Sequence, residues 1–309
     1  MLAYVARRLL WTPVLLTAIS FAVFLLGTYG PGDPVEVRLG QNYTEERADR
    51  LREQLGLDDP FVVQWLRYVG NALKGDLGES YAFPGRKVTA LLGPKLLASA
   101  QLNVAAFTVT TLIGIPLGFY AARRQGTWKD PAVVISSLIL YAMPVFFTAP
   151  FLILVFAVNL DWFPVSGWGG LFDKRMILPA VTVGIPGAAV FIRLMRASTL
   201  DVIAQEYVRT ARAKGLGSLV INYRHIARNA IIPILTIMGF AFAGLFGGAL
   251  IVELIFGIPG VGRISLDSVF ARDYPVIMAV VLMGSTMLVM ANLLIDIVYT
   301  LVDPRIRLQ

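Results

Sequence analysis

Between two long apolar runs the chain carries a charged, helix-forming segment, Glu206-Tyr-Val-Arg-Thr-Ala-Arg-Ala-Lys-Gly215. Apolar residues recur at helical spacing up to Ala211, and Gly215 stands where a left-handed residue ends a helix. Ser218 can cap a second helix behind that turn. We predict a helix, a glycine turn and a second helix within a loop of about 198–230. Such a loop separates two membrane spans. It is either a docking element or a solvated basic loop.

The composition indicates a membrane protein. Of the 309 residues 57% are hydrophobic and only 15% are charged, whereas a soluble domain carries roughly 25% charge. The chain has no cysteine, so disulfides and iron–sulfur clusters are excluded, and a single histidine, His225, excludes a histidine metal cluster. The sequence contains no G-x-x-x-x-G-K-[ST] phosphate-binding loop. Composition therefore predicts no metal site, and no catalytic set is visible.

Six apolar runs are long enough to cross a bilayer, for which about 20 residues are needed. They cover roughly 9–28, 98–120, 132–157, 176–197, 231–256 and 276–302. Because backbone groups cannot stay unpaired in lipid, we expect helices, and the predicted fold class is an all-α polytopic membrane protein with six transmembrane helices. The first run has the alternative of a cleaved signal peptide. Its length and the lack of a small-residue cleavage site argue against that.

The Lys and Arg residues predict the orientation of the spans. Segments on one side hold 14 of them, and short segments on the other side hold 4: Lys174, Arg175, Arg263 and Arg272. The richer side is expected to be cytoplasmic, with both termini there. This bias explains most of the net charge of +7, so nucleic-acid binding is not expected. The chain divides into a tail and first span (1–28), an extracytoplasmic segment (29–97) and a core (98–309).

The extracytoplasmic segment should contain two short helices. Thr44 can cap the first and Gly56 can end it, while Asp59 can cap the second with Pro60 at its first position. Two interpretations stay open and are compatible. The segment is a small cap packed on the membrane domain, or it is a docking surface for an extracytoplasmic partner.

Several features of the spans predict bending and close packing. Prolines are expected to interrupt or bend them at Pro116, Pro144, Pro150, Pro179, Pro186 and Pro233. Gly244 and Gly248 form a small-xxx-small pair in the fifth run, typical of helix packing and also of a subunit interface or gate.

Few ionisable residues fall in or beside the spans. Glu253 and Asp296 lie near span ends, where snorkelling or a helix-to-helix hydrogen bond is the simpler interpretation and a substrate contact the alternative. Arg193 and Arg196 are expected to anchor the fourth span to headgroups, and His225 is expected to pack or cap.

Nine short strings in order carry a family signature. They are Pro31-Gly-Asp-Pro34, Gly56-Leu-Asp-Asp-Pro60, Lys74-Gly-Asp-Leu-Gly-Glu-Ser80, the segment Glu206 to Gly215, His225-Ile-Ala-Arg-Asn-Ala230, Phe256-Gly-Ile-Pro-Gly-Val-Gly262, Arg272-Asp-Tyr-Pro275, Asn292-Leu-Leu-Ile-Asp296 and Asp303-Pro-Arg305. Nearly end to end, the chain resembles an inner-membrane permease subunit of a binding-protein-dependent ABC importer, the B-type subunit of dipeptide and oligopeptide systems. The 198–230 loop corresponds to the family's coupling motif, although Arg209-Thr-Ala211 replaces its Glu-Ala-Ala and Pro233 falls late.

The resemblance implies a type I importer permease fold in a bacterial or archaeal plasma membrane. It implies as partners a second, related permease subunit, two cytoplasmic ATPase subunits that hold ATP and Mg²⁺, and an extracytoplasmic substrate-binding protein. This chain would carry no cofactor and no enzymatic activity. The residues implied to contact an ATPase subunit are Glu206, Tyr207, Arg209, Thr210, Ala211, Arg212, Lys214, Gly215 and Leu216; those implied for an external gate are Glu253, Pro259, Gly260 and Gly262.

Two other functional classes compete. A secondary transporter or channel usually places a charged site at mid-membrane on broken, repeated helices, and neither a mid-span charge nor an inverted repeat is visible. An integral membrane enzyme needs a clustered catalytic set, which is not visible either. Within the family, the cargo is expected to be a peptide. Glutathione, nickel chelates and haem are the alternatives that the resemblance leaves open.

Overall fold

The computed structural model describes the backbone of residues 2–30, 33–244 and 247–302, and within these ranges all side chains except those of 2–6, 8, 34, 42, 236, 239–243 and 294–302. In this part of the chain every regular element is a helix, and an isolated antiparallel bridge joins Glu79 to Lys87. The predicted all-α fold class is confirmed. The strings around Pro31 and Asp303, and the side chain of Asp296, lie outside the described residues.

The chain forms two compact units. The first consists of Met1–Ser99, Phe246–Leu250 and Pro259–Gln309, and the second consists of Ala100–Leu245 and Ile251–Ile258. Helix α5 (Val88–Arg123) contributes to both.

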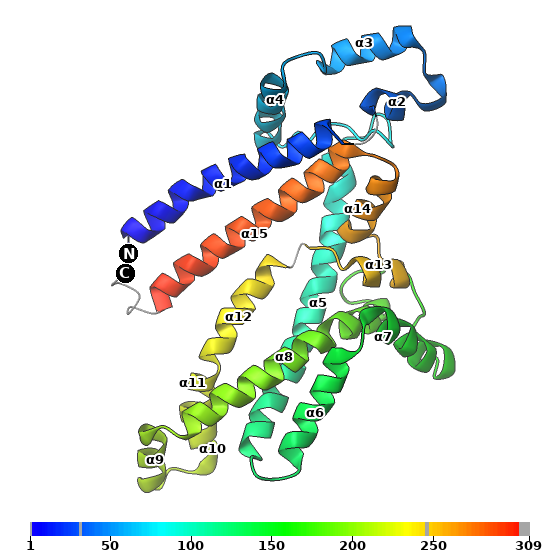
Figure 1. Cartoon of the computed structure of the whole chain (residues 1–309). Helices are drawn as coiled ribbons and strands as arrows, with labels where there is room; N and C mark the ends of the chain where they lie inside the picture. The colour runs from blue at the N-terminus through cyan, green and yellow to red at the C-terminus, as the bar shows by residue number, and fades with distance from the viewer. Residues whose placement is uncertain (1, 31–32, 245–246, 303–309) are drawn as a thin grey trace. The chain divides into compact units, whose positions relative to one another are not determined.

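In the first unit, long helix α1 (Leu2–Thr28) packs along α15 (Tyr274–Val302), and the two run side by side (Figure 1). Helix α14 (Val261–Phe270) packs on α15 as well. The segment that follows α1 forms α2 (Pro34–Leu39), the turn η1 (Gly40–Asn42), α3 (Glu45–Leu55) and α4 (Phe61–Leu73). The core of this unit joins α5, α14 and α15 through the buried side chains of Val88, Leu92, Ile264, Val276 and Ala279.

In the second unit, α6 (Lys129–Ala142) and α7 (Val145–Leu152) pack on α8 (Ile177–Ile203). The π-helical η2 (Ile153–Asn159) continues α7, and the turn η3 (Lys174–Met176) precedes α8. Beyond α8 come α9 (Glu206–Ala213), α10 (Ser218–Val220), the π-helical η4 (Ile221–Ala227), α11 (Arg228–Ala230), α12 (Ile232–Ala243) and α13 (Leu250–Phe256). Phe191, Met195, Ala230 and Ile234 form a core between α8 and the α11–α12 region.

The six predicted runs do not all appear as single helices. Four helices in the described residues are long and apolar enough to cross a membrane, and a bent pair makes up to five. That pair, Lys129–Ala142 and Val145–Asn159, is bent by 102°. The bend falls at Pro144, as predicted, because the residue before a proline is driven out of the helical region: Met143 has φ −74° and ψ 122°. The count of six spans stays a prediction.

The fifth predicted run is broken. Helix α12 ends at Ala243, and α13 starts at Leu250. The prediction that Gly244 and Gly248 share one helix face is therefore wrong. Gly248 meets α14 instead: a β-carbon on it would lie 2.2 Å from the Gly262 nitrogen. Glycine at this position permits two backbones to approach closely.

The other prolines have varied effects. Pro179 and Pro233 lie in the first turn of α8 and α12, where a missing N–H costs little. Pro150 precedes the π-helical η2. Pro116 and Pro186 lie inside continuous helices, so neither proline interrupts its span, and the alternative that they bend it stays a prediction.

The caps predicted for the helices of residues 29–97 are partly right. Thr44 Oγ1 accepts a hydrogen bond from the Arg47 N–H at 3.4 Å, and Gly56 ends α3 with φ +61°. The second cap is shifted by one residue: Pro60 is the cap of α4 and Asp59 pairs with Arg67 instead.

The end of this segment is tied to the start of α15. The buried carboxylate of Asp273 accepts hydrogen bonds from the Ser80 hydroxyl, from the Tyr81 N–H at 3.0 Å and from the Ala82 N–H at 3.3 Å. We call this set of four residues the Asp273 junction. One buried acceptor thereby fixes a loop that lies 191 or more residues away in the sequence.

Candidate coupling site

Helix α9 has sharply defined ends. It starts after Gln205, which has extended backbone angles, and stops at Lys214. Gly215 follows with φ +76°, as predicted for a left-handed terminal glycine. The N–H groups of Gly215 and Leu216 donate to the carbonyls of Arg212 and Ala211 at 3.0 and 3.3 Å. These bonds use carbonyls that the helix end would leave unpaired.

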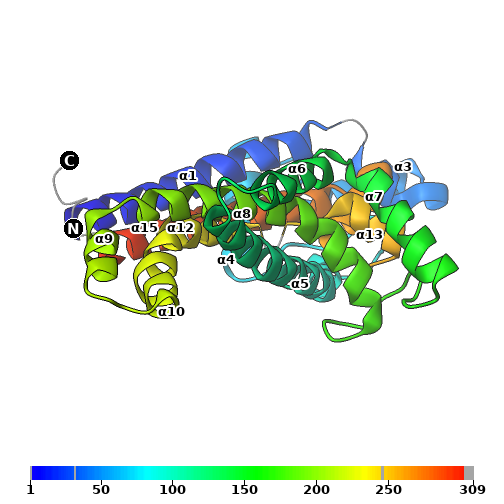
Figure 2. The ribbon, with the colours of Figure 1, turned by 90° about the horizontal axis from the view of Figure 1, so that it is seen from below.

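One face of α9 is packed inward. Val208 and Ala211, three residues apart, are buried and form a cluster with Ile221 and Ile226 of η4. We call residues 206–227 the α9 hairpin, and Figure 2 shows α9 beside α10 within it. The apolar pattern predicted this helix–turn–helix correctly. The predicted Ser218 cap is wrong, because Gly217 holds the cap position and Ser218 is the first helical residue.

Of the nine predicted contact residues, eight are exposed: Glu206, Tyr207, Arg209, Thr210, Arg212, Lys214, Gly215 and Leu216. Ala211 is the exception and is 5% exposed, so it supports the hairpin from within and is not available to a partner. Glu206 and Arg209 form an ion pair of 3.0 Å in which both side chains remain at least 70% exposed. Such a pair contributes little to stability.

The sequence reasoning missed an apolar part of the same surface. Leu219 and Tyr223 are each 70% exposed and Val220 is 45% exposed, just beyond the glycine turn. A partner that covered the hairpin would therefore meet apolar side chains as well as Arg212 and Lys214. The sequence did contain a signal for this surface, because Leu219, Val220 and Tyr223 are apolar residues in an otherwise basic, polar loop.

The hairpin is held to its own unit by a few hydrogen bonds. The buried Ser198 hydroxyl of α8 donates to the Ala230 carbonyl at 2.8 Å. Asn229 donates to the Tyr207 hydroxyl at 3.2 Å and to the carbonyl of His225 at 2.7 Å. His225 is half-buried, in keeping with a packing residue. These bonds connect α8, α9 and α11. A displacement of the hairpin would therefore be transmitted to α8.

Arg196 was predicted to anchor the fourth span to headgroups. Its guanidinium instead donates two hydrogen bonds to the carboxylate of Asp130, at 2.6 and 2.7 Å. Asp130 is 5% exposed and lies in the first turn of α6. Arg193 lies over the ring of Tyr141 at 5.3 Å and is likewise engaged by α6. Fork-to-fork pairing is the strongest arginine geometry, and here it fastens α6 to the end of α8 that leads into the hairpin.

The predicted gate residues are divided between the two units. Glu253 belongs to the second unit and is fully buried, which disagrees with snorkelling, one of its two simpler interpretations, and leaves the helix-to-helix hydrogen bond as a prediction. Its carbonyl accepts from the Ile258 N–H at 2.9 Å across the turn at Gly257. Pro259, Gly260 and Gly262 belong to the first unit, where Gly260 is the cap residue of α14.

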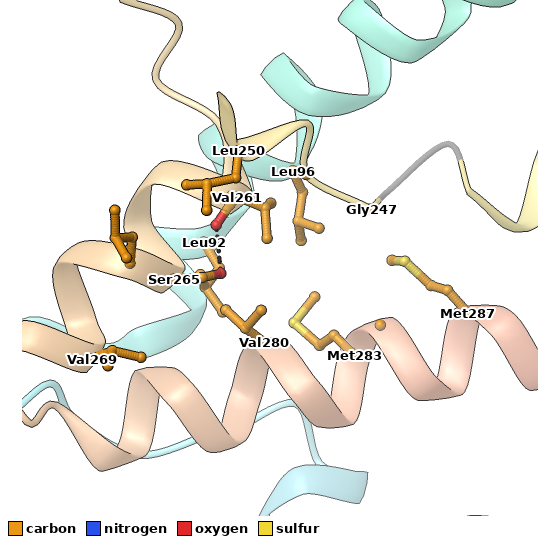
Figure 3. Close-up of a pocket in the computed structure, with 14 residues that line it drawn as sticks. Leu92, Leu96, Gly247, Leu250, Val261, Ser265, Val269, Val280, Met283 and Met287 are labelled. Carbon is orange, nitrogen blue, oxygen red and sulfur yellow. Dashed lines mark hydrogen bonds between the residues drawn. The ribbon is translucent and has the colours of Figure 1, made fainter. Parts of the chain in front are cut away.

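Gly262 borders an apolar cavity of about 380 Å³ within the first unit (Figure 3). Leu92, Val261, Val280 and Met283 line it, and the hydroxyl of Ser265, which also lines it, donates to the Val261 carbonyl at 2.6 Å. The cavity therefore offers no charged group to a polar cargo. Among the described residues no three His, Cys, Asp or Glu side chains are placed to hold a metal ion.

Comparison with known proteins decides the family. Residues 114–308 match the family described as binding-protein-dependent transport system inner membrane component. Residues 1–85 match the N-terminal family of the same transport-system membrane components. The chain belongs to this permease family. The α9 hairpin lies entirely within the first of these matches, while α1 to α4 and the Ser80 end of the Asp273 junction lie within the second.

Relatives of this permease cover its whole length. A probable peptide ABC transporter permease of Sinorhizobium fredii is 37% identical over 98% of the chain and 99% of its own length. An oligopeptide transport system permease of Bacillus subtilis is 37% identical over 99% of both chains. A glutathione transport system permease of Escherichia coli K12 is also 37% identical over 99% of both.

A solved structure supports the fold. The crystal structure of an amino acid ABC transporter with histidines matches with a TM-score of 0.50 at 17% identity, covering 68% of this permease and 92% of that chain. At that identity the likeness shows the fold alone.

Proposed function

We propose that this permease is the membrane subunit of an ATP-driven importer and that the exposed face of its α9 hairpin binds a cytoplasmic ATPase subunit. The observation that carries the proposal is the combination in residues 206–227 of a packed inner face and an outer face of exposed basic and apolar side chains. A solvated loop has no need of Leu219 and Tyr223 at 70% exposure. A protein partner would bury both.

The same geometry supports a route for coupling. Closure of the ATPase pair on ATP would move the hairpin, and α8 joins α9 across only Ala204 and Gln205. The Ser198–Ala230 bond and the Asp130–Arg196 pair fasten α11 and α6 to the same helix. A force applied to α9 would therefore move α6, α8 and α11 together, which is how a rigid two-state element transmits a binding event.

Peptides are the cargo that two of the relatives favour, through the names of the Sinorhizobium and Bacillus proteins. Glutathione, itself a modified tripeptide, is the second candidate. It is favoured by an Escherichia coli relative of equal identity. The cavity beside Gly262 is apolar and uncharged, so we assign selection of the cargo mainly to an extracytoplasmic binding protein.

The remaining assignments concern assembly and orientation. We place both termini and the hairpin in the cytoplasm, on the strength of the Lys and Arg bias, and residues 29–97 on the outside facing the binding protein. A second permease subunit, two ATPase subunits and membrane lipid complete the assembly. ATP and Mg²⁺ would be held by the ATPase subunits, and the membrane would be the bacterial or archaeal inner membrane.

Reconstitution tests the proposal. The purified permease, its companion permease, the ATPase subunits and the binding protein are placed in vesicles, and uptake of a labelled dipeptide is followed with and without ATP. We expect uptake only with ATP and only with ATPase subunits, and we expect Lys214→Glu to reduce it because a partner that binds a cation would meet an anion. Solute movement without any ATPase subunit would overturn the proposal.

A further inference from the structure

Helix α4 has apolar side chains on two adjacent sides, and only one of them is packed. Phe61, Trp65 and Tyr68 occupy the packed side at helical spacing. The rings of Phe61 and Trp65 each lie 5.4 Å from Phe21 of α1, and Tyr68 lies 5.4 Å from Phe24. This aromatic contact fixes α4 against the end of α1 (Figure 1).

The second side carries the apolar stripe, which we define as Val62, Leu66, Val69 and Leu73. These residues recur every three to four positions, about 100° round the helix from the packed side. Val62 is 55% exposed, Leu66 57% and Leu73 85%. Val69 between them is partly buried. The described residues therefore leave three of the four apolar side chains of the stripe exposed.

The polar residues of α4 lie on a third side of the helix, where Gln64 and Arg67 bind residues that precede the helix. Gln64 donates to the carbonyls of Leu57 and Asp59, each at 2.8 Å, and Arg67 pairs with Asp59. The helix thus separates a polar side, which is satisfied locally, from an apolar stripe. By contrast α3, in the same segment, is charged and exposed through most of its length, as a water-facing helix should be.

The position of α4 along α1 indicates what covers the stripe. The apolar span in α1 covers Leu9–Thr28. Phe21 precedes Thr28 by seven residues, about 10 Å at 1.5 Å per residue, and Trp65 reaches further, donating to the Ser20 hydroxyl at 3.3 Å. Part of α4 therefore lies beside the last two turns of a candidate membrane span. On those turns the side chain of Leu26 is 72% exposed.

We propose that α4 lies in the interfacial layer of the bilayer, with the apolar stripe against phospholipid acyl chains and the Gln64–Arg67 side toward the headgroups and water. The stripe belongs to a helix packed on the apolar span of α1, and Trp and Tyr, such as Trp65 and Tyr68, are enriched at membrane–water interfaces. The binding of an amphipathic helix to such an interface becomes stronger with the apolar area that it buries there. The segment after the first span is then anchored in the membrane as well as folded above it.

The native absence of cysteine permits a direct test. A bimane fluorophore is attached to Leu66→Cys or Val62→Cys in the full complex, assembled with partner subunits whose own cysteines have been replaced. The complex is reconstituted in vesicles of phosphatidylethanolamine and phosphatidylglycerol with brominated acyl chains. We expect both positions to lose fluorescence to the bromines within about twofold of the loss at Leu26→Cys. Aqueous iodide should quench them little.

Two controls make each outcome decisive. Glu46→Cys on α3 should be quenched by iodide and not by brominated lipid, and Asn71→Cys on the polar side of α4 should respond more to iodide than Leu66→Cys does. Quenching of Leu66→Cys by iodide alone would place the stripe in water and overturn the proposal. Quenching by neither agent would mean that a protein subunit covers it, which also overturns the proposal.

Discussion

The α9 hairpin and the Asp273 junction both lie outside the long helices. They differ in their polar groups, which are hydrogen-bonded internally at the junction and exposed to solvent in the hairpin. At the junction one buried carboxylate takes three donors from Ser80, Tyr81 and Ala82. In the hairpin Lys214, Arg212 and Tyr223 extend into solvent. Both are held firmly to the chain beneath them, by the carboxylate in one case and by Val208 and Ala211 in the other.

This difference separates a structural junction from a binding surface. A region whose polar groups are satisfied internally stabilises its own fold and has little left for a partner. A region with a packed inner face and exposed outer side chains presents those side chains to a partner. Substitutions should accordingly affect stability at the junction and coupling at the hairpin.

Gly215→Val should have the largest effect on transport. Gly215 has φ +76°, a conformation that costs a non-glycine residue about 1–2 kcal/mol and a β-branched one more. A β-carbon would meet nothing within 4 Å, so the effect comes from the backbone and not from a clash. We expect loss of ATP-driven uptake and of ATPase association, measured in reconstituted vesicles and by co-purification.

Gly126→Val is the matched control. Gly126 lies in the loop between α5 and α6 with φ +82° and similarly open space around it. The backbone strain is therefore comparable, while the hairpin is untouched. If the two variants lose ATPase association equally, general destabilisation explains the result and the docking assignment fails.

Asp273→Ala should lower the stability of the permease. The molecules that still fold should keep ATP hydrolysis coupled to transport. Removal of the carboxylate leaves three donors without their acceptor, at a cost of about 3 kcal/mol. The thermal unfolding midpoint in detergent should fall, and residues 76–87 should become sensitive to protease. Asp267→Asn, an exposed position on α14 with a 4.0 Å partner, should leave the midpoint unchanged. Equal shifts for both variants would contradict the assignment of the junction.

Asp130→Asn should have an intermediate effect. It weakens a bidentate pair whose carboxylate is buried, at a cost of about 2 kcal/mol in unfolding free energy. Glu206→Gln breaks the exposed pair with Arg209 and should change the same quantity by less than about 0.5 kcal/mol. Denaturant unfolding of the two variants compares them directly, and a larger loss for Glu206→Gln would contradict the assigned ranking.

The smallest effect should come from Asp33, at the start of α2. Burial alone would raise the pKa of Asp33, but hydrogen bonds from the Val35 N–H and from Arg52 outweigh it and bring the pKa below 3.8. A lowered folded-state pKa gives stability that is present above pH 3.8 and is lost as the pH falls through the folded-state value. Hydrogen exchange at the Val35 amide, relative to its intrinsic rate, should accelerate only as the pH falls below 3.8 through the folded-state pKa of Asp33. In Asp33→Asn this pH-dependent acceleration should be absent.

Local patterns predicted the hairpin well. Apolar spacing and Gly215 define α9 because a helix and its left-handed end depend on neighbouring residues. The span limits were less accurate: α5 starts at Val88, before the apolar run at 98, because a helix can continue past the apolar stretch when the chain packs around its end.

The long-range features were not predictable in the same way. Asp130 and Arg196 are 66 residues apart, and nothing in either local sequence identifies the other. The break between α12 and α13 reflects the Gly248–Gly262 approach, a tertiary contact that a hydropathy pattern does not contain. The wrong cap at Asp59 has a similar cause, since its carboxylate is taken by Arg67.

Site-specific cross-linking tests the central claim most directly. Single cysteines at Lys214 on the hairpin and Glu46 on α3 are introduced into the cysteine-free chain, and a short bifunctional reagent is added to the assembled importer. The account predicts that Lys214→Cys links to an ATPase subunit and Glu46→Cys does not. A link from Glu46→Cys to an ATPase subunit, or from Lys214→Cys to the binding protein, would contradict it.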